Sequence, residues 1–275
     1  MKDIQLDYIQ PSDIFHLAIK NREPVWKLES LRAQVYFDWE VDPEDRRYSP
    51  SSGLFYAVIH NNIQYARYLL SHFPKDSIKV PGFKRDQCPR YAFHLGLAIT
   101  YNRQKILSMI IETCQKDPVL QSYINLEIFF YPMEGKTPLH LACELLRSDL
   151  VLTLLCHGAS SRADDLGQTP MDVILTHLWS SKDNMKPKIQ CLDYLLLFTL
   201  PGRLQMSRTL QENREYWETL LGDDIYNYLL GLRPAPLGLM SMKKVLQQLP
   251  PSKFLISIQQ LPIPQSMKNR FTLGY

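Results

Sequence analysis

The sharpest pattern of apolar and polar positions in the chain lies between Gly135 and Ala159. Thr137 and Pro138 suit the start of a helix, because the threonine hydroxyl can accept from the first turn and proline lacks only an N–H that this turn leaves unpaired. Gly158 suits a left-handed stop after a second helix. The apolar residues at helical spacing are Leu139, Leu141, Ala142 and Leu145 in the first helix and Leu150, Leu152, Leu154 and Leu155 in the second. The pattern predicts a unit of helix, turn, helix and glycine.

This helical pattern recurs along the chain. Relative to Ala142, the matching positions are Ala18, Ala57, Ala98 and Ile174, and the successive spacings are 39, 41, 44 and 32 residues. A single helical pair cannot bury both of its faces, so the recurrence predicts stacked pairs. We expect about five pairs between residues 12 and 200, with few or no strands and a degenerate, cap-like first repeat.

The unit between Gly135 and Ala159 resembles an ankyrin repeat. The family pattern of Thr-Pro-Leu-His, a following Ala, a Leu-Leu pair and a closing Gly-Ala is met at Thr137, Pro138, Leu139, His140, Ala142, Leu154, Leu155, Gly158 and Ala159. The family period is about 33 residues, so the longer spacings imply insertions in the connecting loops. The resemblance implies an all-α ankyrin-repeat solenoid of about five helix pairs with irregular connecting loops.

Two of these insertions are candidate client-binding loops, because loops tolerate changes in length and often carry recognition. Residues 126–133 contain an aromatic cluster that is a candidate anchor, and residues 75–90 are basic and suited to steering an acidic client. The residues concerned are Phe129, Phe130 and Tyr131 in the first loop and Lys84 and Arg85 in the second. The competing interpretation is a solvated charge run and a loop folded over the core.

After residue 200 the repeat pattern stops. Residues 213–232 predict two short helices separated at Gly222, each with an apolar face. We expect residues 201–233 to cap or connect the open end of the repeat domain, residues 12–200. Residues 234–275 begin a different organisation, with two motifs of their own.

The first tail motif is Leu237, Ser241 and Val245, spaced i, i+4, i+8. On a helix this spacing presents one stripe to a partner groove, and a small middle residue lets the backbone approach. The motif resembles the elongin-binding box at the head of a SOCS box, where Ser241 stands at a position that more often carries Cys. The resemblance implies binding of elongin B and elongin C through these three residues.

The second tail motif is Leu261, Pro262, Ile263 and Pro264. Prolines fix an extended segment in advance, so little chain entropy is lost when it docks. The motif resembles the cullin-selecting part of a SOCS box. It implies binding of a cullin scaffold, with the fifth cullin favoured and the second as the alternative.

Both motifs follow ankyrin repeats in the order that this family of receptors uses. The resemblance covers most of the chain and implies an all-α fold with a C-terminal helical SOCS-box-like module. It further implies a substrate-recognition subunit of a cullin-RING E3 ubiquitin ligase that binds an unknown protein client through the ankyrin stack. The alternative is a non-catalytic ankyrin scaffold whose tail only caps the solenoid.

Composition excludes other classes of partner. The chain of 275 residues carries a net charge of +3, which is too small to predict a nucleic-acid interface. No apolar run approaches the ~18 residues of a membrane span, so no membrane partner and a cytoplasmic location are expected. Five cysteines without CxxC pairing favour reduced thiols over disulfides or a metal site. No cofactor is predicted.

Catalysis is not expected either. His140 with Cys143, and His157 with Cys156, are the pairs that would supply a base and a nucleophile. His140 belongs to the turn signature of the repeat, where the ring hydrogen-bonds neighbouring turns, and no orienting group accompanies either pair. The sequence also lacks a glycine-rich phosphate loop. We therefore expect a protein that is not an enzyme.

Overall fold

The computed structural model describes residues 11–34, 48–80, 91–128, 135–200, 202–249 and 254–268. Within these ranges the chain forms helices and no strand, which confirms the expected all-α class. It separates into two compact units, Met1–Tyr123 and Ile124–Tyr275. The division into segments 12–200, 201–233 and 234–275 stays a prediction. No helix among the described residues is both long and apolar enough to cross a bilayer.

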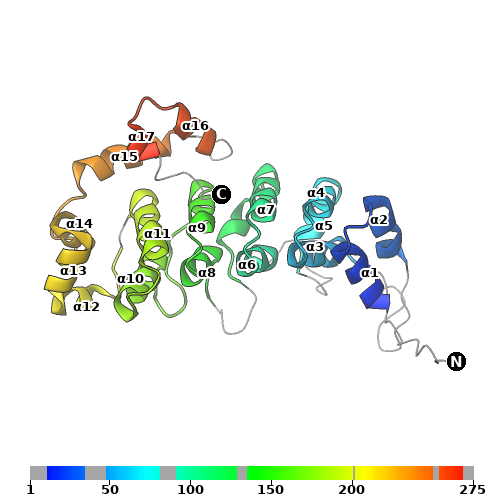
Figure 1. Ribbon diagram of the computed structural model, residues 1–275, viewed down its shortest axis with the longest axis horizontal. Helices are drawn as coiled ribbons and strands as arrows, with labels where there is room; N and C mark the ends of the chain where they lie inside the picture. Colours follow the sequence, from blue (N-terminus) through cyan, green and yellow to red (C-terminus); the bar gives the residue numbers. More distant parts are fainter. Residues whose placement is uncertain are drawn as a thin grey trace. The chain divides into compact units, whose positions relative to one another are not determined.

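The described part of the first unit contains three helix pairs (Figure 1). The pairs are α1 (Pro11–Lys20) with α2 (Val25–Ala33), α3 (Pro50–Ile59) with α4 (Ile63–His72), and α6 (Phe93–Thr100) with α7 (Gln104–Lys116). The first helices pack in one row, α1 on α3 and α3 on α6, and the second helices pack in another, α2 on α4 and α4 on α7. Each repeat thereby buries the faces that it cannot cover alone.

Two shorter helices also occur in this part of the chain, and the second of them begins in the first unit and ends in the second. They are α5 (Pro74–Ile78), which packs on α3, α4 and α7, and the 3-10 helix η2 (Gln121–Asn125), which follows α7. The sequence predicted an irregular basic loop over residues 75–90, so its first residues differ from that expectation. They are helical because Pro74 opens the turn and the Ser77 hydroxyl donates to the Leu69 carbonyl at 3.1 Å.

The second unit contains two further pairs and a helical C-terminal region. The pairs are α8 (Pro138–Glu144) with α9 (Ser148–Cys156) and α10 (Pro170–Ser180) with α11 (Met185–Phe198). The other helices are α12 (Ser207–Glu212), α13 (Arg214–Leu221), α14 (Asp223–Leu229), α15 (Leu237–Gln247), α16 (Phe254–Gln260) and α17 (Gln265–Lys268). Helices α8 and α10 pack together, as do α9 and α11, and α15 packs on α11. The expected break at Gly222 separates α13 from α14.

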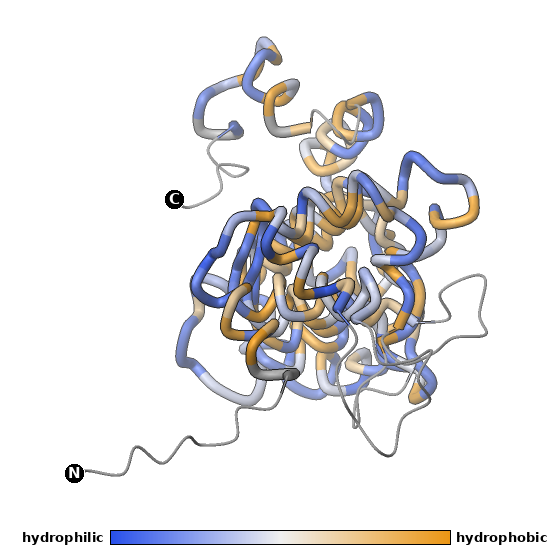
Figure 2. Tube along the Cα trace, turned by 90° about the vertical axis from the view of Figure 1, so that its right-hand side faces the viewer, coloured by the Kyte–Doolittle hydropathy of each residue, from blue (hydrophilic) through white to orange (hydrophobic). Residues whose placement is uncertain are grey.

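The hydrophobic positions of each pair supply its core. Hydrophobic and hydrophilic positions alternate along the helices (Figure 2). The reference residues Ala57, Ala98, Ala142 and Ile174 are fully buried and Ala18 is nearly so. At the four alanine positions, a larger side chain would need more room between the two helices of the pair. The fifth repeat differs, because Ile174 fills the corresponding buried position.

The turn between the helices of a pair has one left-handed residue. Arg22, Asn61, Asn102 and Leu146 have φ between 52° and 56°, and each lies four positions after its reference alanine. This agreement places the four repeats in the register that the sequence predicted. In the fifth repeat α10 is longer, and the left-handed residue is Asn184, immediately before α11. Helix α11 begins at Met185, and Pro187 is tolerated within its first turn.

Candidate protein-binding site

Helix α15 carries the predicted elongin-binding residues, and its faces differ sharply. Leu237 is 80% exposed and Ser241 is also exposed, whereas Val245 is half-buried at the edge of the same stripe. The opposite face contains the buried residues Lys243 and Leu246. The described structure therefore presents the first two motif residues to solvent while the other side of the helix rests on the repeats.

Lys243 is the residue that ties α15 to the body of the unit. Its side chain is only 9% exposed, and its Nζ donates to the Thr199 carbonyl at 2.8 Å and to the Tyr228 hydroxyl at 3.0 Å. Thr199 is the C-cap of α11, where the helix dipole favours a cation, and the ammonium also lies 5.3 Å from the Tyr228 ring centroid. These contacts join α11, α14 and α15 at one point.

The contact made by Lys243 marks the inward face of α15. Apolar side chains lie around the whole helix, since Leu237 and Met240 are exposed and Leu246 is buried. Hydrophobicity alone therefore selects no single docking face. A buried polar group can specify a register at some cost in stability, and the buried Lys243 contact distinguishes one side of α15 from the others. Sequence reasoning missed Lys243, because two adjacent lysines in a helix, here Lys243 and Lys244, normally indicate solvated side chains.

The predicted cullin-binding motif connects α16 to α17. Leu261 and Ile263 are half-buried, and Pro262 and Pro264 are exposed. The segment is not helical, and α17 begins immediately after it at Gln265. The Lys268 ammonium donates to the Gln259 carbonyl at 2.7 Å, which ties the two ends of the connection together. The motif is thus a short connection between two helices in which the two prolines are exposed.

The predicted client-binding residues lie outside the described residues. They are Phe129, Phe130 and Tyr131 in one loop and Lys84 and Arg85 in the other. Their assignment stays a prediction.

His140 occupies a structural position in α8. Its Nδ1 accepts from the Thr137 N–H at 3.2 Å and lies 2.9 Å from the Thr137 hydroxyl, and its Nε2 donates to the Gln168 carbonyl at 3.0 Å. Both ring nitrogens are therefore used, and burial lowers the pKa of the imidazole below its ordinary value. Asp172 closes the same capping box with Thr169 in the next repeat. The ring joins neighbouring turns, as the sequence predicted.

The cysteines beside the two candidate histidines are buried thiols. Burial raises the pKa of Cys143 well above its ordinary value, and burial likewise raises the pKa of Cys156. A nucleophilic cysteine requires the opposite shift, toward the thiolate. The His157 ring instead uses its Nδ1 on the Thr153 carbonyl at 2.7 Å. Neither pair forms a nucleophile with an activating base.

Comparisons with known proteins agree with the fold. The sequence profile of the ankyrin repeat family matches residues 134–166. Ankyrin repeat domain-containing protein 9 of Mus musculus is 31% identical over 294 aligned residues, which cover 96% of this chain and 90% of the mouse protein. The calmodulin-binding transcription activator homolog 1 of Caenorhabditis elegans is 25% identical over 144 residues, which are half of this chain and 10% of that protein. The second likeness is therefore partial.

Proposed function

The chain belongs to the family of ankyrin repeat domain-containing protein 9, and on that premise we propose that it is the substrate-recognition subunit of a cullin-RING E3 ubiquitin ligase. Its ankyrin repeats make it a protein-interaction module. The ankyrin stack binds the client, α15 binds elongin C within the elongin B–elongin C complex, and the turn with Pro262 and Pro264 binds a cullin. The fifth cullin is favoured and the second is the alternative.

The exposure of Leu237 carries this proposal. A leucine that is 80% exposed on a helix whose other side is packed gains little from its own fold. Met240 is exposed beside it, one turn along the same side. This arrangement suits a helix laid in a partner groove, where apolar anchors enter pockets and a small residue such as Ser241 allows close approach.

A non-catalytic ankyrin scaffold remains the second candidate, and the packing of α15 on α11 favours it. In that reading the tail only caps the repeats. A pure cap would need only the inward side of α15, formed by Lys243 and Leu246. The apolar residues on the outward side have no role in it, so the receptor function accounts for more of the helix.

The test is a calorimetric titration of the purified full chain with the elongin B–elongin C complex. We expect Leu237→Ala to weaken binding at least ~30-fold, because truncating a leucine buried in a groove costs about 2–5 kcal/mol. Leu232→Ala is the matched control, since Leu232 is 66% exposed and lies outside the motif. Absent binding by the parent chain, or equal binding by Leu237→Ala and the parent, would leave the scaffold reading.

A further inference from the structure

The loop of residues 160–168 in the second unit presents one leucine rigidly to solvent. Leu166 is 78% exposed at the tip of this loop. The Asp164 carboxylate accepts from the N–H groups of Leu166 at 3.0 Å and Gln168 at 2.8 Å, and the Gly167 N–H donates to the Asp164 carbonyl at 2.9 Å. From the other side, the Gln205 amide donates to the Leu166 carbonyl at 2.6 Å. The loop is therefore fixed before any partner arrives.

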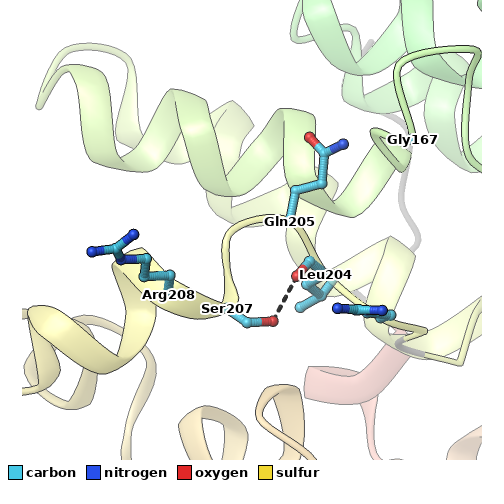
Figure 3. A pocket seen from close by; sticks show the side chains of 6 residues that line it. Gly167, Leu204, Gln205, Ser207 and Arg208 are labelled. Atoms are coloured by element: carbon cyan, nitrogen blue, oxygen red, sulfur yellow. Dashed lines mark hydrogen bonds between the residues drawn. The ribbon is translucent and has the colours of Figure 1, made fainter.

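A pocket of about 510 Å³ adjoins this loop. Its lining residues are Gly167, Arg203, Leu204, Gln205, Ser207 and Arg208, five of which are labelled in Figure 3. Gln205 is shared by the pocket and the brace of Leu166, so the two surfaces are continuous. Leu204 is buried and supplies an apolar floor, and the Ser207 hydroxyl donates to its carbonyl at 2.6 Å.

The charge of the pocket is one-sided. Two of its lining residues are arginines and none is acidic. Arg203 forms no ion pair among the described residues. Arg208 pairs with Glu212 at 2.7 Å, but both side chains are largely exposed, and such a surface pair exchanges at little cost. The Asp165 side chain packs against Gly135 on the preceding loop. The contact is so close that a β-carbon at position 135 would lie 2.4 Å from the carboxyl carbon of Asp165.

We propose that this pocket docks an acidic, extended segment of a client protein. One apolar residue of that segment packs against Leu166, and its carboxylates bind Arg203 and Arg208. Arginine suits this role because its guanidinium binds carboxylates in a bidentate geometry, and a pre-fixed apolar anchor loses little entropy on binding. The identity of the segment as part of a ligase client rests on the proposed function, whereas the binding of an acidic segment does not.

The test uses a fluorescein-labelled peptide in which one leucine is flanked on both sides by glutamates. Fluorescence polarisation measures its binding to the full chain. Combined Arg203→Ala and Arg208→Ala changes are expected to weaken binding by about tenfold or more and to reduce its salt dependence. Leu166→Ser is expected to weaken binding of this peptide about tenfold but to leave a serine-centred peptide unaffected. Arg214→Ala is the matched control, because Arg214 is an exposed arginine that also pairs with a glutamate four residues on, Glu218, and lies outside the pocket.

Three results would overturn the proposal. The first is that a lysine-flanked peptide binds as tightly as the glutamate-flanked one. The second is that Arg214→Ala weakens peptide binding as much as the combined Arg203 and Arg208 changes. The third is that the combined Arg203 and Arg208 variant binds the peptide as tightly as the parent chain. The elongin titration of that variant is expected to match the parent chain. If the parent chain did not bind the elongin complex but did bind the peptide, the ligase function would be refuted and the site for an acidic segment would stand.

Discussion

Replacing Lys243 tests how α15 is held. Lys243→Ala removes two charge-assisted hydrogen bonds, to the Thr199 carbonyl and the Tyr228 hydroxyl, and leaves both acceptors unpaired at a buried position. Hydrogen bonds to charged groups contribute about 1.5–3 kcal/mol each, but the variant also removes the cost of burying an ammonium. We expect a net loss of roughly 2 kcal/mol in the free energy that opposes undocking of α15.

Hydrogen exchange of the full chain measures this loss. A change of about 2 kcal/mol corresponds to exchange in α15 that is ~30-fold faster, while α8 and α9 are expected to keep their protection. Lys244→Ala is the matched control, because Lys244 is the exposed neighbour on the same helix. Unchanged exchange of α15 in Lys243→Ala, or equal acceleration in Lys244→Ala, would refute the account of Lys243 as the docking contact.

Lys243→Met probes the rotation of α15 separately, because methionine keeps an unbranched stem and removes the charge. With Cys88 replaced by serine, a cysteine introduced at Ser241 should react with a thiol reagent much faster than one introduced at Leu246, since the first position is exposed and the second is buried. In Lys243→Met we expect this difference to shrink. If the ratio of the two rates stayed as in the parent, apolar packing alone would fix the face of α15.

Two further predictions concern the repeats. Leu146→Asn should raise stability by about 0.5–1 kcal/mol in thermal unfolding. Leu146 has φ 52° at the position where the two preceding repeats have Asn61 and Asn102, and asparagine tolerates that conformation better than leucine. A lower melting temperature would contradict the strain argument. Burial lowers the pKa of His94 from 6.5 to about 4. Below pH 6.5 the unfolded chain therefore takes up a proton that the folded chain does not. The free energy of unfolding should fall by on the order of 3 kcal/mol between pH 6.5 and 4. His94→Gln should flatten that part of the pH dependence relative to the parent, and an unaltered difference between pH 7 and pH 5 would count against it.

The repeats were predictable because their packing requirement is local. A small residue at Ala57 or Ala98 and a turn four positions later are both set by neighbouring residues, so the sequence pattern carried the register of the helix pairs. The two helices around Gly222 were predictable for the same reason, because glycine accepts the φ of 79° that ends α13.

The site was predictable only in part, because its remaining contacts join residues far apart in the chain. Lys243 meets Thr199 across 44 positions, and Gln205 meets Leu166 across 39. No periodicity marks either partner. The short helix α12 between the repeats and α13 was also missed, since its six residues include a single buried apolar side chain, that of Leu210. Too little apolar surface is present there to produce a helical pattern.

Photocrosslinking from position 240 tests the central proposal most directly. A photoreactive amino acid replaces Met240, which is exposed on the outward side of α15 beside Leu237, and the full chain is irradiated with the elongin B–elongin C complex. The same amino acid at Gln211, exposed on α12, is the control. The account predicts a crosslink to elongin C from position 240 and none from position 211. No crosslink from position 240, or equal crosslinking from both positions, would contradict a tail that binds elongin through the outward face of α15.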